Sequence, residues 1–460
     1  MRWNTKTGHR RLRISLGSAF SIHMSENVEG DYHLDLEEDY EVVHKNGWRP
    51  DPYGEGVIPV GTCTTMCTYE EMQERERQKR LSKYETIPDT NPPRVDTKLA
   101  MKEFSRSAAG REFCQAMNLR PWSVLRRGLH HLLLDISLRD DDWMYICGFV
   151  FDRLKSIRQD MVIQRIEGLR CVEILEGSVR FLIYSMYKLT CVAKDYTAEH
   201  PFKVILSPAG TPVSGLNNYE VNILREMKLT TQCLRGCLNS LIIQYQEYVP
   251  DSPNRYLFES INIIVNLPQL LGHHSVGSEL LSKRELRNRD RLFKTVFHMR
   301  REHVSGNHLT ALKHLPELRE HPLVMLAYSF VLPILQISMI ARLRRAYSSR
   351  GPNITTPDHL CKIICPEWLD ISYDERLIFT IFMAVQCGIF DESKDAINFN
   401  LRNNVIPEPV NWFHQKTVDE IESDNETRIY AMQMIAGRNW SIFAETLKVY
   451  GLESVLDPRQ

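Results

Sequence analysis

Three cysteine pairs with the spacing C-x3-C are the residues of this 460-residue sequence that most readily suggest chemistry. They are Cys63/Cys67, Cys233/Cys237 and Cys361/Cys365. Structural zinc sites use four ligands and usually closer thiol pairs, whereas a free cysteine is also a good small core residue. We therefore expect all three pairs to pack in hydrophobic cores, without a metal or any other cofactor.

The first pair lies in the stretch GTCTTMCTYEEMQERERQKR, where a densely charged run follows the cysteines. We interpret Cys63 and Cys67 as a structural latch that anchors this charged segment. Gly61, just before them, is expected to let the entering chain turn tightly.

The charged run has the pattern of a surface helix. Thr68 and Glu71 have the spacing of a capping box. Two ion pairs with i,i+4 spacing are predicted on the helix surface, Glu71/Arg75 and Glu76/Arg80. Prolines within 87–94 cannot continue the helix and should end it.

Histidines and aspartates do not form a catalytic pattern. The adjacent residues His130/His131 and His273/His274 point to different faces of a helix, so neither pair chelates a metal alone. The run 140–142 of three aspartates suits a helix start better than paired acid–base catalysis. The motifs G-x-S-x-G, G-x-x-x-x-G-K-[ST] and H-E-x-x-H do not occur. The sequence therefore predicts a protein without enzymatic activity.

Seven basic residues are candidates for contacts with nucleic acid: Lys102, Arg106, Lys155, Arg158, Arg342, Arg344 and Arg345. The whole chain has a net charge of −1, so a nucleic-acid site must be a local patch. The alternative is that these residues form solvated faces or intramolecular salt bridges, since Asp152 and Asp160 lie close to some of them in the sequence. The pattern leaves both interpretations open.

Helices must position most of these residues. The clearest is predicted at 142–162, and a second apolar stripe lies at 227–245. The first stripe consists of Trp143, Ile146, Cys147, Val150, Leu154, Ile157 and Met161, and the second of Met227, Leu234, Leu238, Leu241 and Tyr245. Further helices are predicted at 172–193, 255–270, 279–300, 308–317 and 322–346, with a loop at 197–217. Such a succession indicates a stacked helical array.

The pattern changes near residue 353. Thr356 and Pro357 are typical of a helix start, a second helix should end at Gly388, and 389–400 reads as a β-hairpin. Three helices followed by a hairpin are the order of a winged helix, with 322–346 as its first helix. The charge-free run 323–341 is expected to be a buried helix and not a membrane span.

Several of these motifs, in this order, resemble the Sac-three/GANP family over roughly 57–405. They are GTCTTMC from Gly61, KEFSRSAAG from Lys102, LRPWSVL from Leu119, FVFDRLKSIRQDMVIQ from Phe149, NRYLFESINIIVNL from Asn254 and SGNHLTALKHL from Ser305. The structural signature residues are Gly61, Cys63, Cys67, Asp152 and Arg153. Thr64 and Thr68 stand where the family commonly has proline, and His308 stands where it commonly has tyrosine.

The resemblance implies a PCI-type fold: mainly α, with a helical-repeat array followed by a C-terminal winged helix with a small β-hairpin. The short type of the family implies a non-enzymatic scaffold subunit for centrosome duplication, spindle assembly and mitotic progression. The long type implies a scaffold for messenger-RNA export at the nuclear pore. An autonomous RNA-binding protein is a further alternative. We expect a cytoplasmic and nuclear protein that reaches the centrosome and spindle in mitosis.

The implied partners are another PCI-domain protein and a small acidic subunit, with weak RNA binding by the chain alone and no membrane. We predict docking at a free strand edge of the hairpin, at Asn398. In the tail, Trp440, Phe443 and Leu447 share one helix face, which fits a helix that binds centrin or, as we favour, one that packs back on the winged helix.

The predicted domains are a disordered basic and acidic segment at 1–56, the signature segment with its charged helix at 57–115, the helical array at 116–320, the winged helix at 321–405 and a helical tail at 406–460. The basic, acid-free residues 1–24 are compatible with a transit peptide, a disordered tail or a translation start at Met24.

Overall fold

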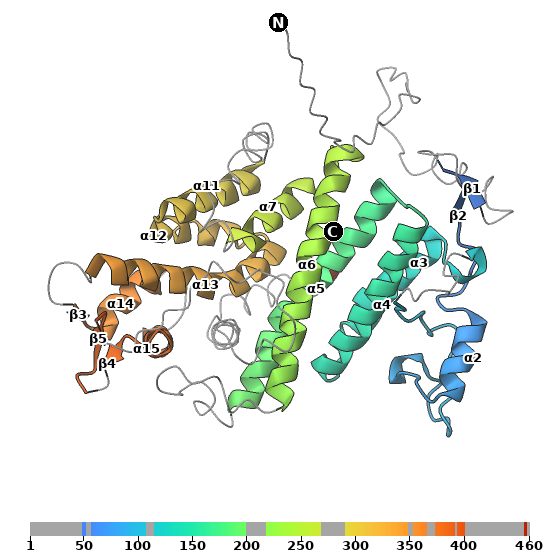
Figure 1. Cartoon of the computed structure of the whole chain (residues 1–460), viewed down its shortest axis with the longest axis horizontal. Coiled ribbons are helices and arrows are strands. Elements are labelled where there is room, and N and C mark those ends of the chain that lie inside the picture. The colour runs from blue at the N-terminus through green and yellow to red at the C-terminus, as the bar shows by residue number, and fades with distance from the viewer. Residues whose placement is uncertain are drawn as a thin grey trace, which may run out of the picture. The chain divides into compact units, whose positions relative to one another are not determined.

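The computed structural model of this chain is mainly helical, as predicted (Figure 1). It describes residues 48–51, 57–106, 115–198, 218–267, 290–347, 353–365, 373–391, 393–400 and 455–457. The chain forms two compact units. Unit 1 comprises Met1–Leu81, Glu85–Leu125 and Gln159–Arg165, and unit 2 comprises Ser82–Tyr84, Arg126–Arg158 and Ile166–Gln460. The predicted domain boundaries stay predictions.

Unit 1 is built from short elements. Strands β1 (Trp48–Pro50) and β2 (Val57–Pro59) pair antiparallel, and helix α2 (Tyr69–Arg77) follows. Thr68 begins α2 as predicted, because its Oγ1 accepts a hydrogen bond from the backbone N–H of Glu71 at 3.4 Å. A 3-10 turn at Ala116–Asn118 completes the local elements.

Helix α2 ends at Arg77, well before the prolines that were expected to stop it. Lys79 then adopts a left-handed conformation with φ of 54°. The predicted Glu76/Arg80 pair is therefore wrong, because the helix no longer brings the two side chains together. Arg80 instead pairs with Glu103, at 3.1 Å.

The first helices of unit 2 follow the predicted apolar stripes. Helix α3 (Trp122–His130) continues into a π-helical turn (His131–Ile136), and α4 (Trp143–Ile163) runs from unit 2 into unit 1. Both predicted stripes are buried along their whole length. Asp142 begins α4 as predicted, since its carboxylate accepts from the backbone N–H of Met144 at 3.1 Å.

Helices α5 (Leu169–Ala198) and α6 (Asn218–Glu247) pack side by side as the longest pair of unit 2 (Figure 1). Next come α7 (Arg255–Val265), α11 (Arg291–Ser305), α12 (His308–Leu312), a 3-10 turn (Leu315–Leu318) and α13 (Pro322–Tyr347). Helix α7 packs against α6, α11 and α13, so successive helices cover one another. Gly306 ends α11 in the left-handed conformation that glycine adopts without strain, with φ of 89°.

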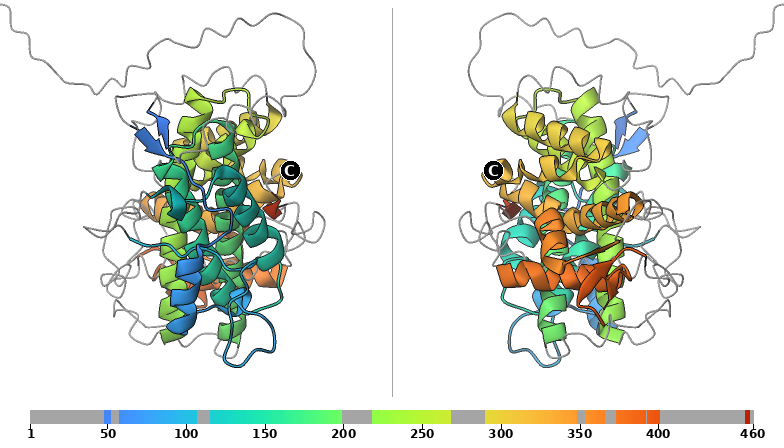
Figure 2. Two further views of the ribbon diagram at one scale, coloured as in Figure 1. Left: turned by 90° about the vertical axis from the view of Figure 1, so that its right-hand side faces the viewer. Right: turned by 90° about the vertical axis from the view of Figure 1, so that its left-hand side faces the viewer.

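The last part of unit 2 combines helices with a small sheet. It comprises β3 (Ile354–Thr355), α14 (Pro357–Ile364), α15 (Tyr373–Gln386), β4 (Phe390–Asp391) and β5 (Ala396–Asn398). Thr356 begins α14 as predicted, accepting from His359 N–H at 3.2 Å. The hairpin of β4 and β5 is also confirmed, and the right-hand view of Figure 2 shows the strands beside α14 and α15. The winged-helix assignment stays a prediction.

The predicted free strand edge at Asn398 is wrong. The strand order is β3-β5-β4, so β5 is the central strand and Asn398 lies opposite Ile354. In the sheet that the structure describes, the edge strands are β3 and β4. Strand β3 has only two residues, which is too short for an alternating pattern to reveal it in the sequence.

The charge-free run 323–341 lies within α13 and contributes to the core of unit 2. Among the helices that the structure describes, none combines the length and the apolar character needed to cross a membrane. His273, His274, Trp440, Phe443, Leu447 and residues 1–24 lie outside the described residues, so what was predicted for them stays a prediction.

Gly61 offers a direct test of packing in unit 1. A Cβ built at Gly61 would lie 2.6 Å from the carbonyl oxygen of Leu119, whereas one at Gly148, on the exposed face of α4, meets nothing within 4 Å. We expect Gly61→Ala to lower the free energy of unfolding by about 1–3 kcal/mol, because backbone must move to make room.

Gly148→Ala is the matched control and should raise stability by about 0.5–1 kcal/mol, as expected for a glycine replaced within a helix. Urea unfolding followed by circular dichroism measures both. Equal effects of the two variants would contradict the close approach at Gly61.

Candidate functional site: the signature segment and its buried ion network

The first cysteine pair packs in the interior of unit 1. Cys67 is fully buried and clusters with Met72 and Ala100. Burial raises the pKa of the Cys67 thiol to about 12, in spite of the nearby Arg75 guanidinium, so this group stays protonated at neutral pH. Cys63, also buried, donates from its thiol to the carbonyl oxygen of Thr65 at 3.2 Å. The structure thus places both cysteines where a packing role requires them.

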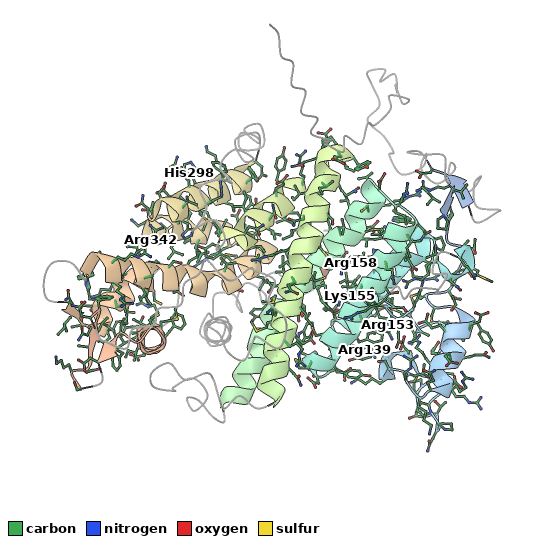
Figure 3. All side chains as sticks on the ribbon, in the orientation of Figure 1. Arg139, Arg153, Lys155, Arg158, His298 and Arg342 are labelled. Carbon is green, nitrogen blue, oxygen red and sulfur yellow. The ribbon has the colours of Figure 1, made fainter. Side chains whose placement is uncertain are left out.

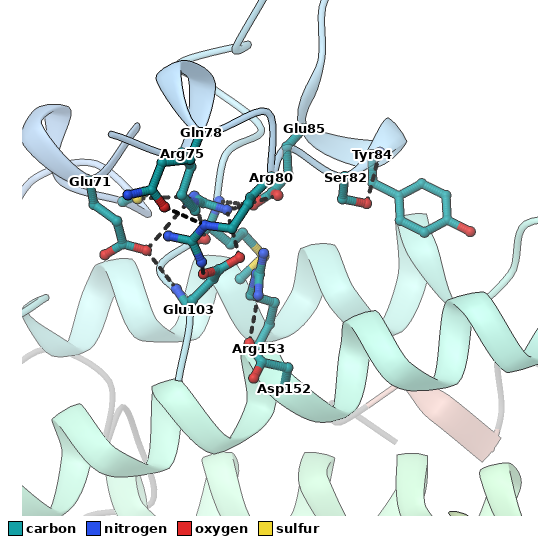
Figure 4. A network of polar contacts seen from close by, with 12 residues as sticks. Glu71, Arg75, Gln78, Arg80, Ser82, Tyr84, Glu85, Glu103, Asp152 and Arg153 are labelled. Carbon is teal, nitrogen blue, oxygen red and sulfur yellow. Dashed lines mark hydrogen bonds and ion pairs between the residues drawn. The ribbon is translucent and has the colours of Figure 1, made fainter. Parts of the chain in front are cut away.

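Arg75 joins the cysteine cluster to a fully buried carboxylate (Figure 4). Its Nη1 donates to both oxygens of Glu85, at 3.0 and 2.9 Å, and its Nη2 donates to the carbonyl oxygen of Met101 at 2.9 Å. Glu85 also accepts from the backbone N–H of Met101, at 2.9 Å. The pair therefore fixes the chain around Met101 from both sides.

Two further carboxylates surround the same guanidinium (Figure 4). Glu71 and Glu103 lie 3.5 and 3.6 Å from nitrogens of Arg75. The predicted Glu71/Arg75 pair is confirmed, but the surface location is wrong, because the Arg75 side chain has no exposed area. Desolvation opposes the charged form of Arg75, yet the attraction of Glu85 outweighs it and raises the pKa.

A second buried carboxylate, Asp160, organises the end of α4. Its Oδ1 accepts from Nζ of Lys102 at 2.8 Å, and its Oδ2 accepts from Nε of Arg120 at 2.7 Å. Asp160 and Arg120 are both fully or almost fully buried. Lys102 donates as well to the carbonyl oxygen of Asn118, at 2.7 Å. Asp160 therefore holds two segments of unit 1 that are far apart in sequence.

Gln164, one helical turn after Asp160, attaches the entering chain. Its Oε1 accepts from the backbone N–H of Gly61 at 2.8 Å, and its Nε2 donates to the carbonyl oxygen of Arg120 at 2.8 Å. Gly61 is thus required because two stretches of backbone approach closely. The interpretation of Gly61 as a turn residue is replaced by this one.

Together, the buried charged residues of this segment form a structural junction. Hydrogen bonds join the side chains of Arg75, Glu85, Lys102, Arg120 and Asp160 to one another, to backbone and, from Arg75, to the sulfur of Cys67. Within the described part of the chain, no group of three or more His, Cys, Asp or Glu side chains is arranged to hold a metal ion. The arrangement is suited to fixing chain segments in place.

In the second signature pair, Arg153 is buried and Asp152 is partly exposed. Nη1 of Arg153 lies 2.5 Å from Oδ2 of Asp152, its neighbour in sequence. The guanidinium also stacks on the ring of Phe149, 4.7 Å from the ring centre. The structural role assigned to Asp152 and Arg153 stays a prediction.

The candidate nucleic-acid residues are spread over several environments (Figure 3). Lys102 is bound to Asp160, and Arg158 donates to the sulfurs of Cys233 and Cys237 on α6. Lys155, half-buried on α4, lies 4.2 Å above the ring of Phe151. The remaining four are Arg106, Arg342 and Arg345, which are exposed, and Arg344, which is half-buried. Their assignment to nucleic acid stays a prediction.

Sequence reasoning did not identify Glu85, Glu103 and Gln164 as partners in this junction, and it treated Asp160 only as a neighbouring charge. One signal was available. The spacing D-x-x-x-Q at Asp160 and Gln164 places both side chains on one face of a helix. Their partners lie 40 or more positions away in the sequence, so no local pattern could have named them.

The similarity of this chain to known proteins includes the signature segment. Residues 66–201 match the profile of the SAC3/GANP family. SAC3 family protein 1 of Schizosaccharomyces pombe is 36% identical over 184 residues, which cover 38% of this chain and 18% of that protein. SAC3 family protein B of Arabidopsis thaliana is 31% identical over 147 residues, 31% of this chain and 8% of the relative. Protein xmas of Drosophila melanogaster is 32% identical over 138 residues, which cover 28% of this chain and 6% of that protein. The chain thus aligns with less than a fifth of each relative.

The junction makes a prediction about Arg75. Arg75→Met should lower the free energy of unfolding by about 3–5 kcal/mol, because it leaves the buried Glu85 carboxylate without its cation. Arg77→Met, two positions along α2 at a side chain that is 76% exposed, should change it by less than about 0.5 kcal/mol. Chemical denaturation of both variants checks this, and a small effect at Arg75 would contradict the junction.

Proposed function

We propose that this chain, whose residues 66–201 match the SAC3/GANP family, belongs to that family and is a non-enzymatic scaffold subunit of a protein complex. The proposed setting is centrosome duplication, spindle assembly and mitotic progression. A messenger-RNA export complex at the nuclear pore is the alternative setting. Both settings come from the family resemblance, and the scaffold role also has support in the structure.

The scaffold proposal rests on the observation that charged residues of the signature segment are buried and paired with one another. An acid–base catalyst must present a titratable group within hydrogen-bond reach of its substrate. Here Glu85 and Asp160 have no exposed area and accept from Arg75, Lys102 and Arg120. Residues that a catalytic site would expose are instead engaged in fixing the fold.

The C-terminal part of unit 2 supplies a candidate docking surface. The order α13, β3, α14, α15, β4, β5 is that of a winged helix, and we propose that a partner with its own PCI-type winged helix packs here, together with a small acidic subunit. Among the described strands, β3 has no partner on its outer side, and this edge is the surface we assign to the contact, since an unpaired edge can accept another strand. Ile354 on this edge is 45% exposed.

Ile354→Asp tests the docking surface. We expect partners to be lost from the tagged chain on affinity purification and mass spectrometry, with unchanged circular dichroism, because a charge on an edge opposes strand pairing. Ile87→Asp is the matched control, at an isoleucine that is 44% exposed in unit 1, and should retain every partner.

Three outcomes separate the proposals. Recovery of all partners by Ile354→Asp would contradict docking at β3. Tagged chain that stays at nuclear pores and never reaches the centrosome or spindle in mitosis would favour the export setting. An autonomous RNA-binding protein would bind single-stranded RNA as a purified chain, with affinity falling as salt rises.

A further inference from the structure

The second cysteine pair differs from the first in both its partners and its accessibility. Cys233 and Cys237 lie one turn apart on α6, and a single guanidinium joins them. Nη2 of Arg158 donates to the Cys233 sulfur at 2.9 Å, and Nη1 donates to the Cys237 sulfur. Cys237 is buried, whereas Cys233 is half-buried, so part of that residue is exposed to solvent.

The charges around the pair favour one thiolate. The pKa of Cys233 is lowered to about 6, first because the Cys237 thiol donates a hydrogen bond to its sulfur. The charge and hydrogen bond of Arg158 and the charge of Lys155 lower the pKa as well, although burial opposes this. The pKa of Cys237 is raised, by its interaction with Cys233 and by burial. The pair thus holds one negative charge near neutral pH, on Cys233, the less buried of the two residues. Helix α5, which also packs on α6, presents the uncharged Met186 to Thr231.

Other cysteines in unit 2 lack this environment. Burial raises the pKa of Cys147 and of Cys171 to about 12, so both remain neutral thiols. A thiolate that is accessible and electrostatically stabilised is the form that reacts with oxidants, whereas a buried neutral thiol is inert.

We propose that Cys233 is a peroxide-reactive thiol and that Cys237 resolves its oxidised form, giving a Cys233–Cys237 disulfide. The Cys233 sulfur attacks one oxygen of a hydroperoxide such as hydrogen peroxide. The S–O bond forms, the O–O bond breaks, and hydroxide leaves, so sulfur is oxidised by two electrons and the peroxide is reduced. The Cys237 thiol then attacks the sulfenic sulfur, and the S–O oxygen departs as water with the proton of Cys237.

The helix makes this disulfide a reversible one. Side chains four apart on a helix have Cβ atoms about 5–6 Å apart, whereas a relaxed disulfide needs about 3.5–4.5 Å. Closing the bond must distort the turn between the two cysteines, and strained disulfides are the more easily reduced ones. Oxidation also removes the anionic partner of Arg158, and so it changes the charge balance on α4.

Peptide mass spectrometry of the full chain tests the reaction. Trypsin cuts after Lys228, Arg235 and Arg255, so the two cysteines fall on separate peptides, 229–235 and 236–255. We expect a slight molar excess of hydrogen peroxide to link these two peptides, and dithiothreitol to separate them. In Cys237→Ser, Cys233 should instead be trapped as a sulfenic acid by dimedone. Cys171 should remain unmodified.

Arg158→Gln tests the cause of the reactivity. At pH 6.5, a full return of the Cys233 pKa from about 6 to about 8.5 would lower the thiolate fraction about 77-fold, while intrinsic nucleophilicity would rise about 13-fold. This is the upper limit of the effect, because Cys237 and Lys155 still lower the pKa in the variant. Alkylation of Cys233 by iodoacetamide should therefore slow measurably in the folded variant, by at most about fivefold to sixfold. Arg165→Gln, at a 48%-exposed arginine in unit 1, should leave the rate unchanged.

The proposal is overturned if neither the linked peptides nor the dimedone adduct forms, or if all cysteines oxidise at one rate. It is also overturned if wild-type Cys233 is alkylated at pH 6.5 no faster than in Arg158→Gln. If that variant unfolds, the pH profile of wild-type alkylation decides. A midpoint near 6 supports the proposal, and a midpoint above 8 contradicts it.

Discussion

The buried carboxylate of Asp160 is the constraint on which the signature segment depends. A charge without exposed area is tolerated only when opposite charges and hydrogen-bond donors compensate its lost hydration. Lys102 and Arg120 provide that compensation, and both must therefore be brought to the last turns of α4. Gln164 lies one turn further and binds Gly61, so the entering chain is fixed by the same helix end. Arg75 and Glu85 form a second fully buried ion pair within unit 1, in which each charge compensates the lost hydration of the other.

The structural role of these charged residues affects where contacts with other molecules are expected. Polar residues in family signatures are often taken as functional groups, but here Arg75, Lys102 and Asp160 are engaged in positioning backbone. Interactions with other molecules are then expected at other surfaces, and the outer edge of β3 in the described sheet is the one we assign to a partner. The Arg158–Cys233–Cys237 cluster is a separate feature, because there a half-buried cation has cysteine sulfurs as partners in place of carboxylates.

The sequence predicted features that depend on local periodicity and missed those that depend on distant contacts. Helix α4 was placed within a residue at each end, since its apolar stripe is continuous. The starts at Thr68 and Thr356 follow from side-chain capping, which is also local. In contrast, the burial of Arg75 was missed because an i,i+4 ion pair has the same pattern on the surface and in the interior. The position of β5 depends on a two-residue strand more than forty positions away, and the need for Gly61 depends on the backbone of Leu119.

Hydrogen exchange of the Asp160→Asn variant tests most directly whether this carboxylate holds the signature segment. In the native chain, the N–H groups of Cys63 and Lys102 donate to the carbonyl oxygens of Leu119 and Met66, at 3.0 and 2.9 Å. The neutral amide of the variant removes the charge that attracts Lys102 and Arg120, so these amides should exchange faster, while those of α6 keep their wild-type rates. Unchanged protection of Cys63 and Lys102 in Asp160→Asn would contradict the account.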